Sequence, residues 1–353
     1  MPVLRSPAVK GFILAAGFGQ RMRPITETVP KPLLPVGNLP LIGYALKLLA
    51  HHGITDVIVN VHHLGKLLKE SLGDGANFGV SITYSEEEEI LGTGGGLKKM
   101  HALLEDDTFV VVNSDTVLDL DLAAVIAAHR ANEALATMVL RQDPRQGEFG
   151  QIEIEQDGRV RKILGQGVAK APVQPYMFAG VHVLEPRFLE YIPPDVQTCI
   201  MRYAYTKALN NNEPLYGATM DGYWSDAGTP ERYFQVNADA LSQGVKLRYA
   251  DPLGGYAIAP KRAVAEVVRM GYDVDFGSGV EIRPPVLLGD GTRIGDNAIV
   301  GPFAVVGPRV QIGKDARLAN VIILDGARID AGITVTNAVV GKKSTLSFRE
   351  ENN

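Results

Sequence analysis

The sequence predicts an α/β domain, in which helices cover a sheet, followed by a short β-solenoid. Between Phe12 and Leu140, short apolar runs rich in β-branched residues alternate with stretches of helical spacing, which is typical of a parallel sheet covered by helices. Between Leu288 and Gly313, an aliphatic residue followed by glycine recurs every six residues. The 353 residues leave room for one large and one small domain.

The spacing of apolar residues predicts the elements of the first domain in order. After a strand over 11–16, apolar residues from Leu41 to Leu49 share one helix face, and Gly53 would end that helix. The pattern then predicts strands over 56–61, 80–84, 108–112 and 134–140, with helices near 64–68, 97–104 and 121–131. Two further β-rich runs over 151–155 and 159–164 flank Gln156-Asp157-Gly158, which predicts a hairpin.

The C-terminal stretch carries the repeat of period six. Its aliphatic-glycine pairs are Leu288-Gly289, Ile294-Gly295, Val300-Gly301, Val306-Gly307 and Ile312-Gly313. Phe276 and Ile282 extend the apolar row backward, while Leu318 and Leu324 extend it forward without the glycine. An inward aliphatic residue on each flat side, with glycine where the backbone turns, is typical of stacked solenoid coils. We expect domain boundaries at 1–245 and 276–345, joined by a linker over 246–275.

Charge and composition exclude several classes of partner. With 35 basic and 40 acidic residues, the net charge of −5 offers no global attraction to nucleic acid or to an anionic membrane, so we expect neither as a partner. No run approaches the roughly 18 apolar residues of a membrane span, and the N-terminus lacks the apolar region of a secretory signal. The single cysteine fits a reducing compartment, and we expect a cytoplasmic protein.

The densest motif lies where the first strand would run into a glycine loop. Gly17 and Gly19 would let backbone N–H groups approach an anion closely. Three cations follow in the same stretch: Arg21, Arg23 and Lys31. The loop is not a Walker A motif, because no Gly-Lys-Ser/Thr follows, and Met22 stands where a dinucleotide fingerprint needs its third glycine. It therefore predicts a phosphate-binding loop of another kind.

The string from Leu14 to Pro24, with Pro30-Lys31-Pro32-Leu33 after it, resembles the signature of nucleotide-sugar pyrophosphorylases. Those enzymes join a nucleoside triphosphate to a sugar 1-phosphate and release pyrophosphate. Further motifs of the family follow in its order: Leu91 to Gly96, Asn113-Ser114-Asp115, Phe149-Gly150 and Trp224 to Pro230. The tail resembles the hexapeptide-repeat left-handed β-helix that ends many such enzymes. The resemblance covers nearly the whole chain and implies a Rossmann-like mixed sheet followed by a left-handed β-helix.

The resemblance also implies roles for individual residues. Arg21 and Lys31 would be catalytic, with Arg21 favouring the leaving pyrophosphate and Lys31 the reacting phosphate. Asp115 and Asp226 would bind a divalent metal, Mg²⁺, which prefers hard oxygen ligands. Nucleotide contacts are implied for Ala15, Ala16, Gly17, Gly19, Arg21, Glu89, Thr93, Gly94 and Asn113. Sugar contacts are implied for Gly150, Phe178 and Gly180. Glu89 ends a run of four glutamates, which a solvated charged edge explains at least equally well.

Departures from the family pattern leave the sugar pocket open. Many relatives carry Glu-Lys-Pro where this chain reads Gly165-Gln166-Gly167, and Asn-Ala-Gly where it reads Phe178-Ala179-Gly180. A replacement cation could come from Arg161, Lys162 or Lys170, although each is also explained as an ordinary surface residue. These departures and the Thr-Gly-Gly-Gly loop resemble uridylyltransferases acting on N-acetylmuramate 1-phosphate. The tail instead resembles mannose-1-phosphate guanylyltransferases.

We therefore expect a metal-dependent nucleotidyltransferase that makes a nucleoside diphosphate sugar by direct displacement, with GTP and a mannose-like sugar phosphate as substrates. One alternative is a UTP-dependent enzyme for N-acetylmuramate or hexose 1-phosphate. The other is a non-catalytic relative that binds a nucleotide sugar and regulates a partner. All seven histidines precede the solenoid, so acyl transfer by the tail is not expected. By analogy, the tail would mediate self-association or regulation.

Overall fold

The computed structural model describes residues 9–144, 151–258 and 268–349. The chain divides into two compact units. The first unit contains Met1–Gly17 and Ile42–Trp224, and the second contains Phe18–Leu41 and Ser225–Asn353. Within the described ranges, no helix is long and apolar enough to cross a membrane.

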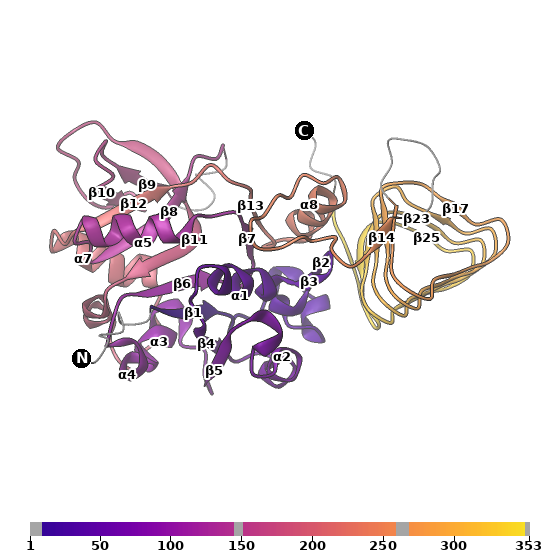
Figure 1. Ribbon diagram of the computed structural model, residues 1–353, viewed down its shortest axis with the longest axis horizontal. Helices are drawn as coiled ribbons and strands as arrows, with labels where there is room; N and C mark the ends of the chain where they lie inside the picture. Colours follow the sequence, from indigo (N-terminus) through magenta and orange to yellow (C-terminus); the bar gives the residue numbers. More distant parts are fainter. Residues whose placement is uncertain (1–8, 145–150, 259–267, 350–353) are drawn as a thin grey trace, which may run out of the picture. The chain divides into compact units, whose positions relative to one another are not determined.

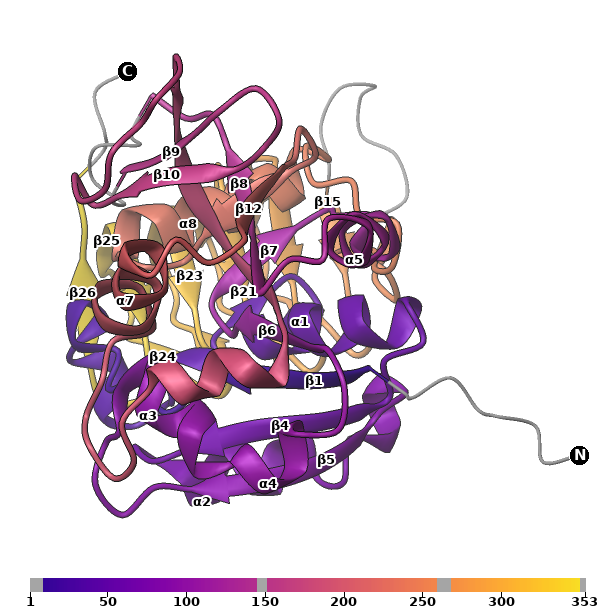
Figure 2. The same ribbon diagram turned by 90° about the vertical axis from the view of Figure 1, so that its left-hand side faces the viewer.

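The first unit is built on one mixed sheet (Figures 1 and 2). Its strands are β1 (Lys10–Leu14), β4 (Asp56–Val61), β5 (Ser81–Glu86), β6 (Phe109–Asn113), β8 (Ala136–Arg141), β9 (Gln151–Ile154), β10 (Val160–Ile163), β11 (Gln174–Leu184) and β12 (Leu215–Thr219), with the short β7 (Thr116–Leu118) outside the sheet. The order is β10-β9-β11-β6-β1-β4-β5, and β8 pairs with both β11 and β12. β6, β1, β4 and β5 are parallel, whereas β11 runs antiparallel to β6. The predicted α/β fold with a mixed sheet is confirmed.

The helices of this unit begin and end close to the predicted positions. They are α1 (Leu41–His51), α2 (Gly65–Leu72), α3 (Gly92–Lys99), α4 (His101–Leu104), α5 (Leu122–Ala131) and α7 (Thr206–Asn210), with shorter helical turns at Ala76–Phe78, Pro186–Tyr191 and Ile200–Tyr205. Asp121 caps α5, because its Oδ1 accepts a hydrogen bond from the Ala124 N–H at 3.1 Å. The single helix predicted over 97–104 is instead two helices. They separate at Met100, whose backbone leaves the helical region with φ −98 and ψ 19.

The second unit contains a β-helix and the segment that follows the glycine loop. Before the β-helix come three short 3-10 turns at Gln20–Met22, Ile25–Glu27 and Lys31–Leu33, then β2 (Pro35–Val36), β3 (Leu39–Pro40) and α8 (Pro230–Leu241), with β13 (Trp224–Asp226) at the boundary. The β-helix strands are β14 (Ala257–Ile258), β15 (Val268–Met270), β16 (Asp275–Phe276), β17 (Glu281–Ile282), β18 (Val286–Leu288), β19 (Arg293–Ile294), β20 (Ile299–Val300), β21 (Ala304–Val306), β22 (Gln311–Ile312), β23 (Arg317–Ile323), β24 (Arg328–Ile329), β25 (Thr334–Val340) and β26 (Thr345–Ser347).

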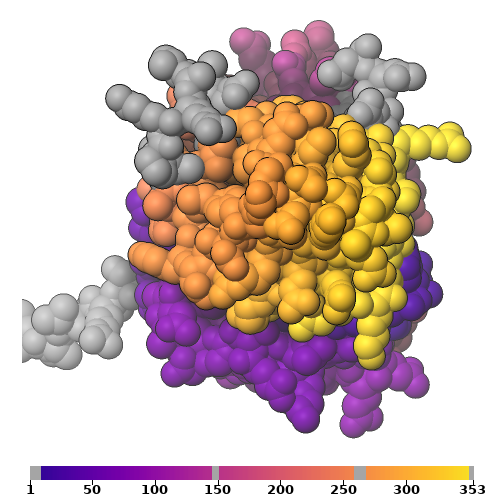
Figure 3. Space-filling view, turned by 90° about the vertical axis from the view of Figure 1, so that its right-hand side faces the viewer, coloured from indigo at the N-terminus to yellow at the C-terminus, as the bar shows by residue number. Residues whose placement is uncertain are grey.

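Each coil of the β-helix stacks directly on the one before it, and successive coils lie side by side from orange to yellow in Figure 3. In the register, Leu288 pairs with Val306, which lies 18 residues later and equals three hexads. Val306 pairs with Ile323, 17 residues later, so this coil is one residue shorter. Ile323 therefore continues the buried column, a correction to the expectation that Leu324 would do so. These aliphatic side chains are buried along the axis, as the repeat predicts.

The repeated glycines are required by the contact between coils. A Cβ at Gly295 would lie 2.5 Å from the backbone nitrogen of Lys314 in the next coil, and one at Gly313 would lie 2.5 Å from that of Ala331. Neither glycine is among the residues with positive φ. The backbone turns at other positions, such as Asn297 (φ 56) and Asp315 (φ 60). Among the five repeat glycines, only Gly301 has positive φ (+102), so the expectation of glycine at a corner holds for Gly301 and is wrong for the other four.

The stack starts earlier than the repeat indicates. β15 pairs in parallel with β18, and Met270 lies beside Leu288 in the register. Met270 keeps the six-residue spacing before Phe276 but is not a branched aliphatic residue, so the pattern did not reveal it. Strands thus form within the segment 246–275 that we expected to be a linker. The domain boundaries themselves stay a prediction.

Helix α8 connects the N-terminal segment of the second unit to the end of the β-helix. Tyr233 Oη donates a hydrogen bond to the Pro35 carbonyl at 2.7 Å. Phe234 packs against Phe348, with ring centroids 4.9 Å apart. Residues 18–41, which include both predicted catalytic cations, Arg21 and Lys31, therefore belong to the same unit as the C-terminal coils.

Candidate functional site

The predicted phosphate loop and the predicted metal motif start from neighbouring strands of the first unit. Leu14 at the end of β1 pairs with Asn113 at the end of β6. Since the strands are parallel, the residues after both strands emerge at one edge of the sheet, where open α/β sheets bind ligands. Ala15, Ala16 and Gly17 follow β1, and Asp115 follows β6. The structure therefore brings these five predicted residues, with Asn113 among them, to one sheet edge.

Gly17 is exposed, whereas Ala15 and Ala16 are buried. A Cβ at Gly17 would meet no atom within 4 Å. Packing of the chain alone does not require glycine at this position. Gly17 also ends the first unit, and Phe18 begins the second, so the predicted loop is shared between the two units along the chain.

A buried hydrogen-bond network fixes the start of this loop. The Ala15 N–H donates to Asn60 Oδ1 at 2.7 Å, and Asn60 Nδ2 donates to Glu87 Oε1 at 2.7 Å. Glu87 Oε2 in turn accepts from the Leu91 N–H at 2.8 Å. Gly96 leaves room for this arrangement, because a Cβ there would lie 2.7 Å from Glu87 Oε1. The network ties the predicted phosphate loop to the start of helix α3, which carries the Thr-Gly-Gly-Gly motif.

Glu87 and Asn60 are residues that the sequence analysis missed. Glu87 is 5% exposed, whereas Glu89 is exposed. A run of four glutamates offers no chemical distinction between its members. The alternation of the preceding strand could have separated them, because Ser85 and Glu87 point to the buried side while Glu86 and Glu88 are exposed. A nucleotide contact by Glu89 stays a prediction.

The Thr-Gly-Gly-Gly loop is held by the segment around Thr198. The Gly94 N–H donates to the Thr198 carbonyl at 2.7 Å, and Thr93 Oγ1 accepts from the Ile200 N–H at 2.9 Å. A Cβ at Gly92 would lie 2.7 Å from the Thr198 carbonyl oxygen, so the close approach requires glycine there. Thr93 and Gly94, which we predicted to lie in a base-binding loop, are therefore in the first turn of helix α3, and the segment around Thr198 fixes that turn.

Two predicted sugar-binding residues lie on β11. A Cβ at Gly180, whose φ is +94, would lie 2.9 Å from Thr116 Oγ1 and 3.4 Å from Asn113 Nδ2. The glycine therefore lets β11 approach the motif that carries Asp115. Phe178 stacks on His182 with ring centroids 4.2 Å apart. The third predicted sugar contact, Gly150, lies outside the described residues.

The aromatic group beneath Phe178 is buried and neutral. His182 Nδ1 lies 2.8 Å from Tyr205 Oη, and the two rings are stacked. Burial lowers the pKa of His182 to about 3 and raises the pKa of Tyr205. The His182 ring that Phe178 stacks on is therefore uncharged at neutral pH, as is the Tyr205 ring next to it.

The second unit places Gly19 beside Lys31. With φ +61, Gly19 has a backbone conformation that favours glycine, and a Cβ there would lie 3.1 Å from the Lys31 Cβ. Thr26 Oγ1 donates to the Gly19 carbonyl at 2.9 Å. The loop thus folds back so that its glycine contacts the chain that carries the predicted catalytic lysine.

The predicted catalytic Arg21 and the predicted metal ligand Asp226 meet at Gly228. A Cβ at Gly228 would lie 2.4 Å from Asp226 Oδ2 and 3.0 Å from Arg21 Nη2. Arg232, which the sequence analysis did not single out, donates from Nη1 to Asp226 Oδ1 at 2.8 Å. The signal that could have revealed Arg232 is its position in the first turn of α8, directly after the Trp-x-Asp motif.

Comparison with known proteins decides the family. A model described as Nucleotidyl transferase matches residues 10–243, and one described as GMPPB C-terminal domain matches residues 282–349. The chain belongs to the nucleotidyl transferase family. The predicted family resemblance and the expectation of a nucleotidyltransferase enzyme are confirmed.

Two similar proteins span most of this nucleotidyl transferase. UTP–glucose-1-phosphate uridylyltransferase of Synechocystis sp. is 31% identical over 345 residues, covering 94% of this chain and 87% of that protein. Mannose-1-phosphate guanylyltransferase of Mycobacterium tuberculosis is 30% identical over 330 residues, covering 93% and 83%. Among solved structures, a proposed glucose-1-phosphate thymidylyltransferase from Bacillus anthracis matches with a TM-score of 0.59 and 26% identity, over 70% of this chain and 99% of that one. All three are named for the predicted class of sugar 1-phosphate enzyme.

In this nucleotidyl transferase, the donors predicted for Mg²⁺ are two aspartates. Carboxylate oxygens suit Mg²⁺, which usually takes one or two protein carboxylates and completes its shell with substrate phosphates and water. Within the described residues, no group of three or more His, Cys, Asp and Glu could hold a metal. The chemistry of each carboxylate therefore fits Mg²⁺, with Asp115 in the first unit and Asp226 in the second. Asp115 is partly exposed, and the Asp226 side chain is 13% exposed.

The stretch that replaces the relatives' Glu-Lys-Pro is a tight turn. Gly167 has φ +110, and a Cβ there would lie 2.2 Å from the Arg161 carbonyl oxygen. The Ile163 N–H donates to the Gln166 carbonyl at 2.9 Å. Two of the proposed replacement cations already have partners on or just after β9: Arg161 bonds Glu155 at 2.7 Å, and Lys162 bonds Glu153 at 3.0 Å. Their ion pairs agree better with a structural role in the hairpin.

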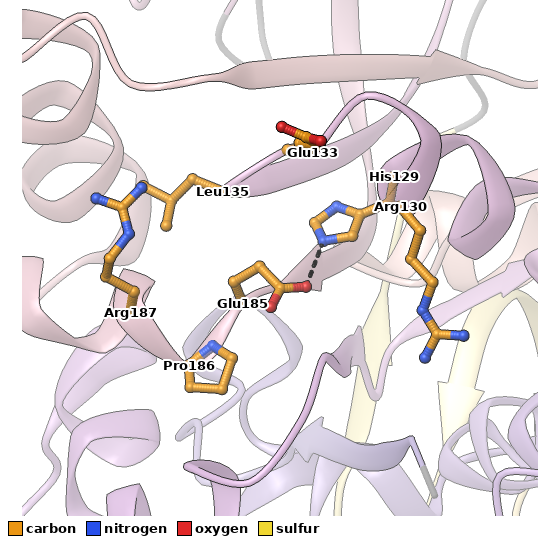
Figure 4. A pocket seen from close by; sticks show the side chains of 8 residues that line it. His129, Arg130, Glu133, Leu135, Glu185, Pro186 and Arg187 are labelled. Carbon is orange, nitrogen blue, oxygen red and sulfur yellow. Dashed lines mark hydrogen bonds and ion pairs between the residues drawn. The ribbon is translucent and has the colours of Figure 1, made fainter. Parts of the chain in front are cut away.

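A cavity of about 550 Å³ lies at the opposite edge of the nucleotidyl transferase sheet (Figure 4). Its wall includes His129, whose Nε2 lies 3.0 Å from Glu185 Oε1. Thr108, just before β6, donates to the same carboxylate at 2.6 Å. The hydrogen bond from His129 holds the pKa of Glu185 below its usual range. Because Thr108 precedes β6 and Asn113 ends it, this cavity is separate from the sheet edge that carries the predicted nucleotide residues.

Proposed function

We propose that the protein condenses a nucleoside triphosphate with a sugar 1-phosphate to give a nucleoside diphosphate sugar and pyrophosphate. A phosphate oxygen of the sugar attacks the α-phosphorus, and the bond to the departing pyrophosphate breaks. The barrier of such a reaction is mainly charge repulsion and in-line positioning. The observation that carries the proposal is the shared sheet edge, where Gly17, Asn113 and Asp115 follow the adjacent strands β1 and β6.

The chain supplies the groups that this chemistry needs. The exposed backbone of Gly17 would approach a phosphate closely, since no side chain of the protein fills the space beside its Cα. Arg21 and Lys31 would neutralise the triphosphate and the reacting phosphate. Asp115 and Asp226 would hold Mg²⁺, which would neutralise phosphate charge when bound. The loop at Thr93 and Gly94 would lie against the base.

For the substrates, we propose GTP and a mannose-like sugar 1-phosphate. The match of residues 282–349 to the GMPPB C-terminal domain and the mannose-1-phosphate guanylyltransferase of M. tuberculosis support this choice. UTP with glucose 1-phosphate is the second candidate, because the uridylyltransferase from Synechocystis is equally similar over the whole chain. Self-association through the β-helix stays a prediction.

Pyrophosphate release tests the proposal. Four nucleoside triphosphates would be combined with the 1-phosphates of mannose, glucose, N-acetylglucosamine and N-acetylmuramate in the presence of Mg²⁺. Release with GTP and mannose 1-phosphate is the expected result, and release with UTP would select the second candidate. If no combination releases pyrophosphate while a nucleotide sugar still binds, the chain is a non-catalytic relative and the proposal is wrong.

A further inference from the structure

Arg232 makes a close and partly buried ion pair with the predicted metal ligand. Its Nη1 donates to Asp226 Oδ1 at 2.8 Å, and the two side chains are only 14% and 13% exposed. A guanidinium in this setting holds a carboxylate more firmly than an exposed ion pair does, because hydrogen bonds to charged groups are short and directional.

The helix that carries Arg232 fixes its place. Thr229 caps α8, since its Oγ1 accepts from the Arg232 N–H at 3.3 Å, and Pro230 occupies the first turn. Tyr233, the next residue, is fully buried and bonds the Pro35 carbonyl. The backbone on both sides of Arg232 is therefore anchored, and its side chain starts from a defined position.

The other oxygen of the carboxylate points to a different place. Asp226 Oδ2 lies over the Cα of Gly228, where a Cβ would approach it to 2.4 Å. Arg21 Nη2 lies over the same glycine, at 3.0 Å from that Cβ position. Arg232 Nη2 lies 3.2 Å from that Cβ position as well, so Asp226, Arg21 and Arg232 all surround Gly228.

We propose that Arg232 is a positioning residue that orients the Asp226 carboxylate for the divalent metal by holding its Oδ1. The inference rests on the proposed function, because it takes Asp226 as a metal ligand. Groups that hydrogen-bond a metal-binding carboxylate fix its orientation, and their loss typically costs about 10- to 100-fold in metal affinity or activity. Gly228 is part of the same arrangement, since any side chain there would displace Oδ2.

The test measures metal binding to the full-length protein directly. Mn²⁺ alone is titrated by the electron paramagnetic resonance signal of the free ion and by the fluorescence of Trp224, the single tryptophan, two residues before Asp226. We expect Arg232→Gln to weaken Mn²⁺ binding about 10- to 100-fold, and Arg232→Lys, which keeps the charge and one donor, to weaken it less. The Mg²⁺ concentration for half-maximal pyrophosphate release should rise by a similar factor, with kcat recovering at high Mg²⁺.

A matched control is Arg187→Gln. Arg187 also bonds a largely buried carboxylate, that of Glu213, but lies beside the cavity at the opposite sheet edge, so its loss should leave Mn²⁺ binding unchanged. Unchanged or tighter Mn²⁺ binding in Arg232→Gln would overturn the inference, and a lower melting temperature with unaltered Mg²⁺ dependence would show a purely structural role. If Arg232→Gln does not fold, Arg232→Lys decides by the same criterion. Asp226→Asn separates the two proposals: if it binds Mn²⁺ like the wild type, the metal role of Asp226 fails.

Discussion

Two acidic residues of this nucleotidyl transferase, Asp115 and Glu87, differ in burial and are expected to have different roles, one in ligand binding and one in the structure of the protein. Asp115 is a partly exposed carboxylate that follows β6, whereas Glu87 is buried and bonds Asn60 and the Leu91 N–H. Both are acidic residues near one sheet edge, but Asp115 is partly exposed, whereas Glu87 is buried and accepts hydrogen bonds from backbone and side-chain donors of the protein. Burial distinguishes the two residues, and the role of each can be tested by a substitution of similar size.

Asp115→Asn should lower the rate of pyrophosphate release by about 100-fold or more. The amide keeps the size of the side chain but loses the charge that would hold Mg²⁺ beside the developing phosphate charge. Steady-state kinetics and a thermal melt would be measured together, with the melting temperature expected to stay unchanged. Wild-type turnover in this variant would contradict the metal role of Asp115.

Glu87→Gln should destabilise the protein by about 1–3 kcal/mol, because one carboxylate oxygen that accepts a buried hydrogen bond becomes an amide donor facing another donor. Glu89→Gln is the matched control, since Glu89 is exposed in the same run, and its effect should stay within about 0.5 kcal/mol. Urea unfolding of both variants would measure the difference. Equal stabilities would show that the network does not contribute.

His182 should make stability depend on acid pH. Its folded-state pKa of about 3 lies below the ordinary value of 6.5, so between these values the unfolded chain binds more protons than the folded one. The contribution of neutral His182 to the free energy of unfolding is therefore fully present above pH 6.5. It is lost as the pH drops toward 3, with a slope of up to about 1.4 kcal/mol per pH unit. Unfolding would be followed across this range in the wild type and in His182→Gln, in which this contribution to the slope should vanish.

At the scale of elements, two kinds of close approach determine where glycine stands. Gly180 and Gly19 combine positive φ with a close neighbour, whereas Gly295 and Gly313 only make room for the next coil of the β-helix. At Gly180, Gly295 and Gly313 the close neighbour belongs to another strand or coil, whereas at Gly19 it belongs to the helical turns that follow the loop. The glycines of the six-residue repeat thus allow close contact between neighbouring coils, while the aliphatic residues of the repeat fill the interior of each coil.

Gly313→Ala should destabilise the β-helix by about 1–3 kcal/mol, because the added methyl group would overlap the backbone nitrogen of Ala331 and the coils would have to separate. The control is Gly244→Ala in the same unit. Its Cβ would meet no atom closer than 3.4 Å, and the expected change is within about 0.5 kcal/mol. Thermal melts followed by circular dichroism would compare them, and an equal effect would contradict the packing argument.

At the scale of the whole molecule, the β-helix belongs to the same compact unit as residues 18–41. That unit carries four predicted site residues: Gly19, Arg21, Lys31 and Asp226. Helix α8 bonds Pro35 on one side and packs on Phe348 on the other. The tail should therefore support the site residues of its own unit, in addition to any role in association.

Val306→Ala, in the buried column of the β-helix, should lower the temperature at which activity is lost. Removing two methyl groups from this core costs about 1–3 kcal/mol, and melting of the unit would release the segment that carries Arg21 and Lys31. Activity after brief heating would be compared with the melting curve of the variant. Activity that persists after the β-helix has melted would contradict this coupling, whereas kcat at low temperature should be close to that of the wild type.

The sequence by itself determined the alternation of strands and helices, the hairpin at β9 and β10, the β-helix and the family. Those features depend on local periodicity and on motifs that are contiguous in the chain, such as the glycine loop before Arg21. The antiparallel position of β11 against β6 was not readable in this way, because strand direction in a sheet depends on pairing between distant segments.

Only the tertiary structure decided which of several residues of the same type forms a hydrogen bond or an ion pair with another part of the protein. It selected Glu87 within a run of glutamates, placed Arg232 on Asp226, and showed that Arg161 and Lys162 bond Glu155 and Glu153. Each choice depends on burial and on partners that lie far away in the sequence or across a turn. A linear pattern records the type of a side chain but not its neighbours, and the energy of a charged group depends mainly on those neighbours.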